Sequence, residues 1–185
     1  MLTKLFLFFL LNHMSYVDSS ISSSALITKT ISVKIDKDSI KSRIEYLNSK
    51  TPFQIDYTPL LEETIINHLE NRQATYLELY SKSDYFFPIF ENALQKYNVP
   101  LELKYLPVVE SALNPRAKSR VGATGLWQFM FNTAKDLDLK VNSYVDERMD
   151  PVKSSEAAAK YLSELYARFN DWNLAIAAYL SLIHI

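Results

Sequence analysis

The chain has 185 residues and only two glycines, Gly122 and Gly125, which stand three positions apart. Glycine permits backbone conformations and a close ligand approach that a side chain would block. Both glycines follow a glutamate, Glu110, that comes directly after the apolar run from Leu106 to Val109. A glycine pair a short distance after such an acid indicates a loop that lines a ligand-binding groove.

Glu110 is the candidate for chemistry. A glutamate is usually exposed and without catalytic function, but apolar neighbours are expected to remove part of its solvation. Desolvation raises a carboxyl pKa, here towards about 6, so that the group remains a proton donor near neutral pH. Trp127 and Gln128 add an aromatic plate and a hydrogen-bonding amide. An acid, an open loop and an aromatic plate together favour cleavage of a sugar polymer.

The same residues form a recognisable motif. The pair Glu-Ser is followed by a serine, by Gly-Ala-Thr-Gly-Leu-Trp-Gln, and later by Asn-Ser-Tyr-Val-Asp-Glu-Arg and Asp-Pro, at Glu110, Ser111, Ser119, 122–128, 142–148 and Asp150-Pro151. This pattern resembles the catalytic domain of lytic transglycosylases with the goose-lysozyme-like fold. The likeness covers roughly residues 84 to 179, and many spaced identities must coincide to produce it.

The resemblance implies a mainly α-helical, lysozyme-like domain with a glycan-binding groove. It implies cleavage of the β-1,4 bond between N-acetylmuramic acid and N-acetylglucosamine in peptidoglycan glycan strands, with a 1,6-anhydro ring in the product. Glu110 would act first as acid and then as base, the substrate's acetamido group would replace a second carboxylate, and no metal or organic cofactor is needed. The residues expected to contact substrate are Ser111, Ser119, Gly122, Ala123, Gly125, Gln128 and Tyr179.

Several of these residues also have ordinary structural interpretations. Ser111 could bond nearby backbone at a helix end, the glycines could mark turns, and a helical Tyr179 could only pack. Trp127 is expected to contact the core and to keep one edge exposed. Phe131 and Asp138 stand where many members of the family have Pro and Gly, and Asp tolerates left-handed backbone better than most residues.

Two other functions fit the same motif. A hydrolytic muramidase of the same fold would use water and would need a positioned water or a second carboxylate, and five downstream acids are candidates: Asp136, Asp138, Asp146, Glu147 and Asp150. A peptidoglycan-binding envelope protein without catalysis is the third interpretation. Product analysis separates the first two, because hydrolysis leaves a reducing sugar.

Composition narrows the classes of partner. The net charge is −1 and 48% of residues are hydrophobic, which is ordinary for a globular chain and does not indicate nucleic-acid binding. There is no cysteine, so disulfides and Cys-based zinc sites are excluded. Three scattered histidines do not form a metal-ligand pattern.

The first 25 residues resemble a secretory signal peptide. Lys4 precedes an apolar run from Leu5 to Leu11, and small residues follow at 22–25. The run is shorter than the 20 or so residues that span a bilayer. The pattern therefore predicts export, and the resemblance to peptidoglycan enzymes implies the bacterial cell envelope, periplasmic or exported, as the destination. Without a cysteine for a lipid anchor, peripheral association is the kind of membrane contact left open.

Helical patterns dominate the rest of the chain. Residues 26–83 are expected to form a linker and helical region, with a short strand at 31–35 and a helix at 60–79. The domain itself is expected at 84–185. Five helices are predicted in it. The first spans 84–97, the second begins at Pro100 and leads to Glu110, and the third spans 126–137. The fourth begins at Asp150-Pro151 and the fifth near Asp171.

The last residues depart from the family pattern. The family continues Ala-Ala-Tyr with Asn and a glycine-containing loop, whereas Leu180 to Ile185 are mostly apolar. The sequence therefore predicts a domain that is truncated or altered after Tyr179. In that case Tyr179 would lack its neighbours and the final helix would be frayed.

Overall fold

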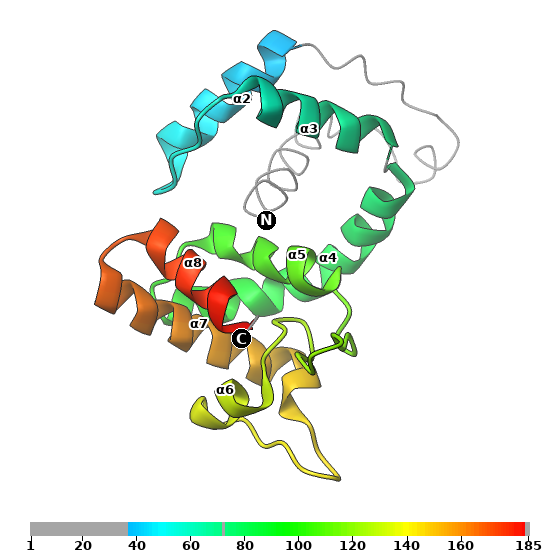
Figure 1. Cartoon of the computed structure of the whole chain (residues 1–185), viewed down its shortest axis with the longest axis vertical. Coiled ribbons are helices and arrows are strands. Elements are labelled where there is room, and N and C mark those ends of the chain that lie inside the picture. The colour runs from blue at the N-terminus through cyan, green and yellow to red at the C-terminus, as the bar shows by residue number, and fades with distance from the viewer. Residues whose placement is uncertain (1–36, 72, 184–185) are drawn as a thin grey trace. The chain divides into compact units, whose positions relative to one another are not determined.

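The computed structural model describes residues 37–71 and 73–183, so the expected signal peptide and the strand at 31–35 lie outside the described residues. The chain divides into two compact units, Met1–Arg72 and Gln73–Ile185. All regular structure in the described residues is helical, with three isolated β-bridges and no strand (Figure 1). The predicted fold class, mainly α-helical, is confirmed.

The first unit contains α2 (Lys37–Lys50) and α3 (Pro59–Asn71). No helix is predicted specifically at residues 37–50, because their Lys, Asp and Ser residues obscure the apolar periodicity. Ile40, Ile44 and Leu47 are nonetheless spaced to share one helical face, and all three are buried. Three apolar residues on one face thus accompany the formation of α2, although the rest of its sequence is mostly polar.

The second unit begins with α4 (Gln73–Lys96), which runs through the gap expected between helices at 60–79 and 84–97. That boundary was wrong because residues 80–83 contain neither glycine nor proline to interrupt a helix. Pro88 lies inside α4. Phe86, Phe87, Phe90 and Leu94 of this helix are buried.

Next comes the short helix that carries Glu110. Pro100 precedes a 3-10 helix, η2 (Leu101–Tyr105), which continues as α5 (Leu106–Ser111). The predicted helix after Pro100 is thus confirmed, with its first turns tighter than α-helical. Pro107 lies in the first turn of α5, where a missing N–H leaves no partner unsatisfied.

Cap chemistry fixes the last two long helices. α7 (Pro151–Phe169) starts as predicted, because Asp150 Oδ1 accepts hydrogen bonds from the N–H groups of Val152 and Lys153 at 2.9 and 3.0 Å. α8 (Trp172–Ile183) starts beside Asp171, whose Oδ1 accepts from Leu174 N at 2.9 Å. The two helices pack on each other, and α7 also packs on α4 (Figure 1).

The predicted helix at 126–137 is shorter in the structure. Residues 126–130 form turns, and α6 spans only Phe131–Asp136. Gln128 has left-handed backbone, with φ of 50°, and Phe129 pairs with Thr124 in a β-bridge. Asp138 also has a positive φ, 62°, as its position in place of a family glycine predicts. No helix in the described residues is long and apolar enough to cross a membrane.

Candidate active site

Glu110 occupies the next-to-last position of α5, among residues that withhold water from it. Leu106, Pro107 and Val108 of the same helix are buried, while Glu110 itself is half-buried. Its Oε1 atom is buried and has no hydrogen-bond partner among the residues that the structure describes. Burial raises the pKa of Glu110 from 4.5 to about 7. The carboxyl therefore holds its proton at a pH where ordinary glutamates have lost theirs.

The backbone reverses directly after the acid. Ala112 and Leu113 are left-handed, with φ of 51° and 56°, and their N–H groups bond back to Val108 O and Pro107 O at 3.1 and 3.3 Å. Such backbone costs about 1 kcal/mol for each residue that is not glycine. Ser111 Oγ donates to Pro107 O at 2.9 Å, so its proton is used inside α5 and not on Glu110.

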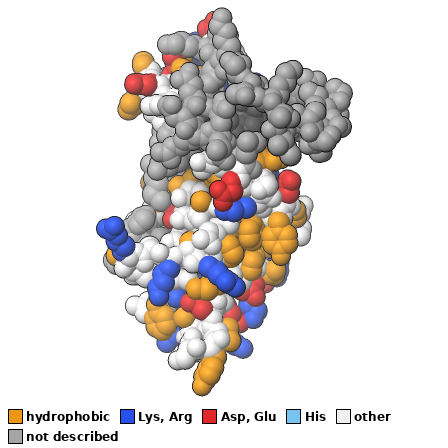
Figure 2. All heavy atoms as spheres, turned by 90° about the vertical axis from the view of Figure 1, so that its right-hand side faces the viewer, with side chains coloured by type: hydrophobic (Ala, Val, Ile, Leu, Met, Phe, Trp, Pro, Cys, Tyr) orange, Lys and Arg blue, Asp and Glu red, His pale blue; other side chains and the backbone are white. Residues whose placement is uncertain are grey.

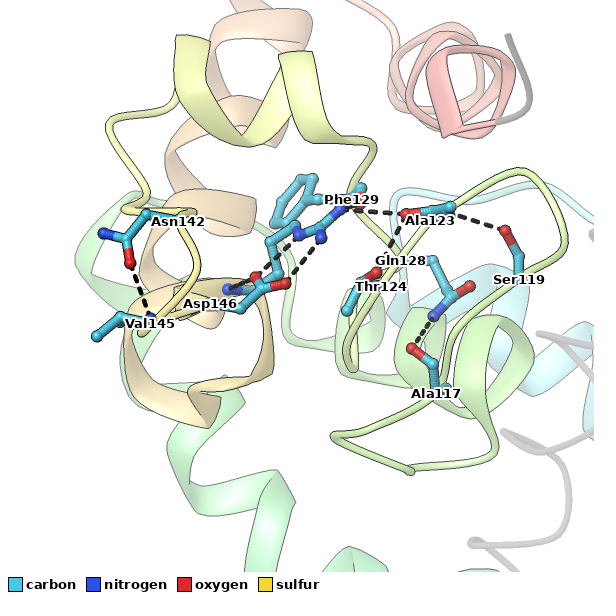
Figure 3. A network of polar contacts seen from close by, with 11 residues as sticks. Ala117, Ser119, Ala123, Thr124, Gln128, Phe129, Asn142, Val145 and Asp146 are labelled. Atoms are coloured by element: carbon cyan, nitrogen blue, oxygen red, sulfur yellow. Dashed lines mark hydrogen bonds and ion pairs between the residues drawn. The ribbon is translucent and has the colours of Figure 1, made fainter.

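Residues 118–124 form a tight hairpin, which we call the glycine hairpin. Lys118 and Thr124 form an antiparallel bridge, and Ser119 N donates to Ala123 O at 2.8 Å. Ser119 Oγ accepts from Ala123 N at 3.0 Å (Figure 3). Gly122 lies at the turn with φ of 96°, and a Cβ placed there would meet no atom within 4 Å. The Gly122 side of the hairpin is open to an approaching ligand, whereas Ala123 is buried.

Gly125 and Gln128 are held by protein groups. A Cβ on Gly125 would lie 1.9 Å from the carbonyl oxygen of Arg148, so the glycine is required by a neighbouring backbone segment. Gln128 is buried, and its Nε2 donates to Gly125 O at 2.8 Å and Ala117 O at 3.3 Å (Figure 3). Its amide N–H groups therefore brace the loop, and only its carbonyl oxygen has no partner among the described residues.

An ion pair that the sequence analysis did not single out fastens this loop. Asp146 caps η3 (Glu147–Met149), which contains the buried Arg148, and Asp146 accepts from Arg148 Nε at 2.9 Å and from Nη2 at 2.7 Å. Arg148 Nη1 then donates to Gly122 O and Phe129 O, both at 3.1 Å (Figure 3). One guanidinium thus joins the glycine hairpin to the turn that follows it. Only the proximity of Asp146 and Arg148 in the motif could have indicated this pair.

Aromatic residues connect the loop to the helices. Trp127 is fully buried, so the expected exposed edge is wrong: its ring packs on Phe90 of α4 and its Nε1 donates to Ser155 Oγ at 2.9 Å. Tyr179 is also fully buried, and its hydroxyl donates to Trp127 O at 3.0 Å. The expectation that Tyr179 lacks neighbours and that α8 frays around it is therefore wrong.

Tyr179 also reports where the acid lies. Burial first, and then the charge of Glu110, raise the pKa of Tyr179 well above its usual value. The Tyr179 hydroxyl also donates to the carbonyl of Trp127. Glu110 and the turn that ends at Gln128 therefore both lie near Tyr179. α5, α8 and the loop after Gly122 therefore meet around the carboxyl.

The five candidates for a second acid are either bonded to other groups or exposed. Burial alone raises the pKa of Glu110, without a contribution from a nearby carboxylate. Three of the candidates are occupied in ion pairs or in a helix cap and two are exposed: Asp146, Glu147 and Asp150 in the first group, Asp136 and Asp138 in the second. Among the described residues, no cluster of three His, Cys, Asp or Glu could hold a metal ion.

Comparison with known proteins identifies the family of the chain. The Transglycosylase SLT domain matches residues 87–181, slightly more than half of the chain. The chain belongs to this family. The SLT match begins within α4 and contains Glu110, the glycine hairpin and the Asp146–Arg148 pair, and it confirms the resemblance drawn from the motif.

Individual relatives are similar over the same region. The chain is 42% identical over 87 residues to membrane-bound lytic murein transglycosylase D of Escherichia coli (strain K12), which covers 46% of this chain and 19% of that protein. It is 34% identical over 103 residues to membrane-bound lytic murein transglycosylase F of Pseudoalteromonas translucida (strain TAC 125), covering 50% and 20%. It is 35% identical over 91 residues to peptidoglycan transglycosylase gp16 of Escherichia phage T7, covering 48% and 7%. The similarity thus spans a fifth or less of each of these three relatives.

Proposed function

We propose that this chain is a peptidoglycan lytic transglycosylase, with Glu110 as its single catalytic acid and base. The observation that carries the proposal is the carboxyl of Glu110, which has a buried oxygen without a partner and a pKa raised to about 7. A group that stays protonated near neutral pH can donate to a glycosidic oxygen and then accept a proton as a carboxylate. The names of the relatives support murein as the substrate.

The proposed reaction has two proton transfers. Glu110 donates its proton to the oxygen of the departing N-acetylglucosamine as the bond to C1 of N-acetylmuramic acid breaks, since an unprotonated alkoxide leaves slowly. The resulting carboxylate takes the proton of the muramic acid's C6 hydroxyl while that oxygen attacks C1. A 1,6-anhydro ring closes, and Glu110 regains its proton.

The environment of Glu110 favours this lyase over a two-carboxylate hydrolase. A second carboxylate near enough to act as nucleophile or base would repel the charged form of Glu110 and add to its pKa shift. Burial alone accounts for the shift. The acetamido group of the substrate is then the group that stabilises the positive charge at C1.

Around the acid, the proposed substrate wall is the open side of Gly122, with Ser111, Ser119, Ala123, Gly125, Gln128 and Tyr179 behind or beside it. Their contacts favour different parts for these residues. Ser119 Oγ accepts a hydrogen bond within the hairpin and keeps its own proton for a ligand. Ala123, Gly125 and Tyr179 are held inside the protein, so they support the wall instead of touching sugar.

The proposed location is the bacterial cell envelope, because peptidoglycan lies there. The relatives named membrane-bound agree with that placement. The predicted export signal at residues 1–25 belongs to the same proposal.

Product analysis of digested murein tests the function. We expect wild-type protein to release muropeptides that end in 1,6-anhydro-muramic acid, with a mass lower by one water than the reducing products of a hydrolase. Because Glu110 must be protonated for the first step, kcat/KM should fall as pH rises above about 7. Reducing products alone would assign a hydrolase, and binding without turnover would assign a binding protein.

A matched pair of variants assigns the acid. Glu110→Gln preserves shape and cannot donate the acid proton, so turnover should fall by at least about a thousandfold while glycan binding is kept. Glu164→Gln makes the same change on an exposed position of α7 and should leave turnover unchanged. Substantial turnover by a folded Glu110→Gln protein would remove Glu110 from its proposed function.

A further inference from the structure

The segment that follows the acid has an uneven charge. The chain contains 21 Asp and Glu residues, yet none lies between Glu110 and Asp136. Four basic residues occupy that interval: Arg116, Lys118, Arg120 and Lys135. The first three stand at alternate positions immediately before the turn of the glycine hairpin. The local charge is therefore strongly positive in a chain whose net charge is −1.

These three basic side chains are exposed and have no ion pair among the residues that the structure describes. Five other basic residues of this unit are paired with a carboxylate, and four are exposed without a pair among the described residues: Lys82, Lys96, Lys104, Arg148 and Lys153 in the first group, Lys135, Lys140, Lys160 and Arg168 in the second. Only Arg116, Lys118 and Arg120 stand at alternate positions of one short segment. The face at the right of Figure 1 shows several Lys and Arg side chains beside hydrophobic ones (Figure 2). Cationic side chains without an acidic partner in the protein can form ion pairs with acidic groups of a ligand.

One acid does come near this group, but it is already occupied. Asp146 has its pKa lowered mainly by hydrogen bonding to Arg148, with a small contribution from the charge of Lys118. Both carboxylate oxygens of Asp146 accept hydrogen bonds from the Arg148 guanidinium. Lys118 therefore gains little from Asp146 and keeps its charge available.

The backbone that presents Lys118 and Arg120 is held in place. The Lys118–Thr124 bridge, the Ser119–Ala123 hydrogen bonds and the bond from Arg148 Nη1 to Gly122 O all fix the glycine hairpin. Gly122, with its open side, lies in the same hairpin two residues after Arg120. A pre-ordered backbone reduces the entropy that binding would otherwise cost.

We propose that Arg116, Lys118 and Arg120 bind the carboxylates of the peptide stems attached to the glycan strand beside the scissile bond. This inference rests on the proposed function. In the intact strand the lactyl carboxyl of muramic acid forms the amide bond to the peptide, so the sugars are uncharged, whereas each peptide stem carries free carboxylates and repeats along the strand. A cationic hairpin beside the substrate wall thus selects glycan strands that still bear their peptides.

An anionic lipid surface has complementary charge as well. The position of the three basic residues favours the substrate, because Lys118 and Arg120 lie in the hairpin that carries Ser119, Gly122 and Ala123 of the proposed wall, and Arg116 lies two residues before it. Carboxylates fixed to the glycan reach this hairpin whenever the strand lies against Gly122. Association with a membrane would not require the basic residues to lie in or beside that hairpin.

The test compares two substrates and two charge-matched variants. The substrates are purified glycan strands with intact peptides and the same strands after an amidase has removed the peptides and the lactyl carboxylate that this cleavage exposes on each muramic acid has been converted to a methyl amide. The first variant is Arg116→Gln/Lys118→Gln/Arg120→Gln. The control variant, Lys140→Gln/Lys160→Gln/Arg168→Gln, removes the same charge from exposed positions outside the hairpin.

For wild-type protein we expect higher kcat/KM on peptide-bearing strands than on stripped strands, mainly through a lower KM. The hairpin variant should lose this preference by about tenfold, since each exposed ion pair contributes only a modest free energy. The control variant should keep it. Raising the salt from 0.05 to about 1 M should erase the wild-type preference, because the screening length falls to about 3 Å.

Three outcomes would overturn the inference while leaving the proposed function intact. They are an unchanged preference in the hairpin variant, an equal loss in the control variant, and a KM change that is the same on stripped strands. Binding of wild-type protein to vesicles of anionic phospholipid, lost in the hairpin variant without any change in substrate preference, would assign the hairpin to a membrane. Failure of wild-type protein to cleave either strand would instead contradict the proposed function.

Discussion

At the scale of single residues, Glu110 combines a property useful for catalysis with one that weakens the fold. Its buried Oε1 lacks a partner, so ionising the carboxyl leaves a charge that the protein does not compensate. The pKa of about 7 measures this cost. Between pH 4.5 and 7 the folded protein holds a proton that the unfolded chain has released. The free energy of unfolding therefore falls as pH rises through this window.

Glu110→Gln should remove that cost. The variant should be more stable than wild-type protein above pH 7, by about 1–3 kcal/mol after allowance for the partial exposure of the carboxyl. The advantage should shrink as pH falls from 7 to 4.5 and vanish below 4.5, where wild-type Glu110 is protonated in both states. Urea unfolding at a series of pH values measures this. A difference that does not change with pH, or that matches Glu164→Gln, would contradict the raised pKa.

The direction of this shift could be predicted from sequence, because the apolar residues that shield Glu110 are its own neighbours in α5. Its size could not, since the missing partner of Oε1 depends on how the loop after Gly122 and α8 close around the carboxyl. The same limit explains Trp127. Its place in the motif could not indicate that Phe90 of α4 and Ser155 of α7 cover its ring completely.

At the scale of elements, the two glycines have different structural environments. Gly125 faces the backbone of Arg148, whereas Gly122 faces open space. Both have a positive φ, so alanine strains either site by about 1–2 kcal/mol. Gly125→Ala must in addition displace a carbonyl 1.9 Å away and should cost about 3 kcal/mol or more in total. Thermal unfolding of the two variants compares these costs, and equal destabilisation would contradict the packing of η3 against Gly125.

The Asp146–Arg148 pair sets the position of the same loop. Arg148→Lys keeps a positive charge but cannot reach Asp146, Gly122 O and Phe129 O together. We expect a folded protein whose kcat/KM falls about tenfold or more, because the loop shifts relative to Glu110. Lys153→Arg, which keeps a charge beside Glu147, is the control and should retain activity. Wild-type kcat/KM in a folded Arg148→Lys protein would show that the pair does not position the site.

Helix boundaries show which parts of the fold were readable from local chemistry. The starts of α7 and α8 were predicted because Asp150 and Asp171 cap them. Each aspartate accepts hydrogen bonds from N–H groups only two or three residues further along the chain. The start of α6 was missed, since the left-handed backbone of Gln128 depends on pairing of Thr124 with Phe129 and on Arg148, a distant residue. Local signals determine caps, whereas nonlocal contacts determine where this loop ends.

At the scale of the whole catalytic unit, α8 reaches the loop through one tyrosine. Tyr179 packs on Phe129 and on Tyr161 of α7, with ring centroids 6.2 and 5.9 Å away, and bonds Trp127 O. Because Phe129 and Trp127 flank Gln128, the docking of α8 supports the turn on which the site depends. The family resemblance places Tyr179 against the substrate. Its contacts instead indicate that it joins α7 and α8 to the loop.

Tyr179→Phe distinguishes these two interpretations. Removing the hydroxyl leaves the buried Trp127 carbonyl without this donor, so we expect a loss of about 1–2 kcal/mol in unfolding free energy with KM unchanged. Tyr161→Phe is the matched control, because the half-buried Tyr161 hydroxyl has no hydrogen bond among the described residues, and it should change stability by less than about 0.5 kcal/mol. Stability from urea unfolding and KM on purified glycan strands are measured for both variants. If Tyr179→Phe raises KM and leaves stability unchanged, Tyr179 contacts substrate directly and its buried bond to Trp127 is broken when substrate binds.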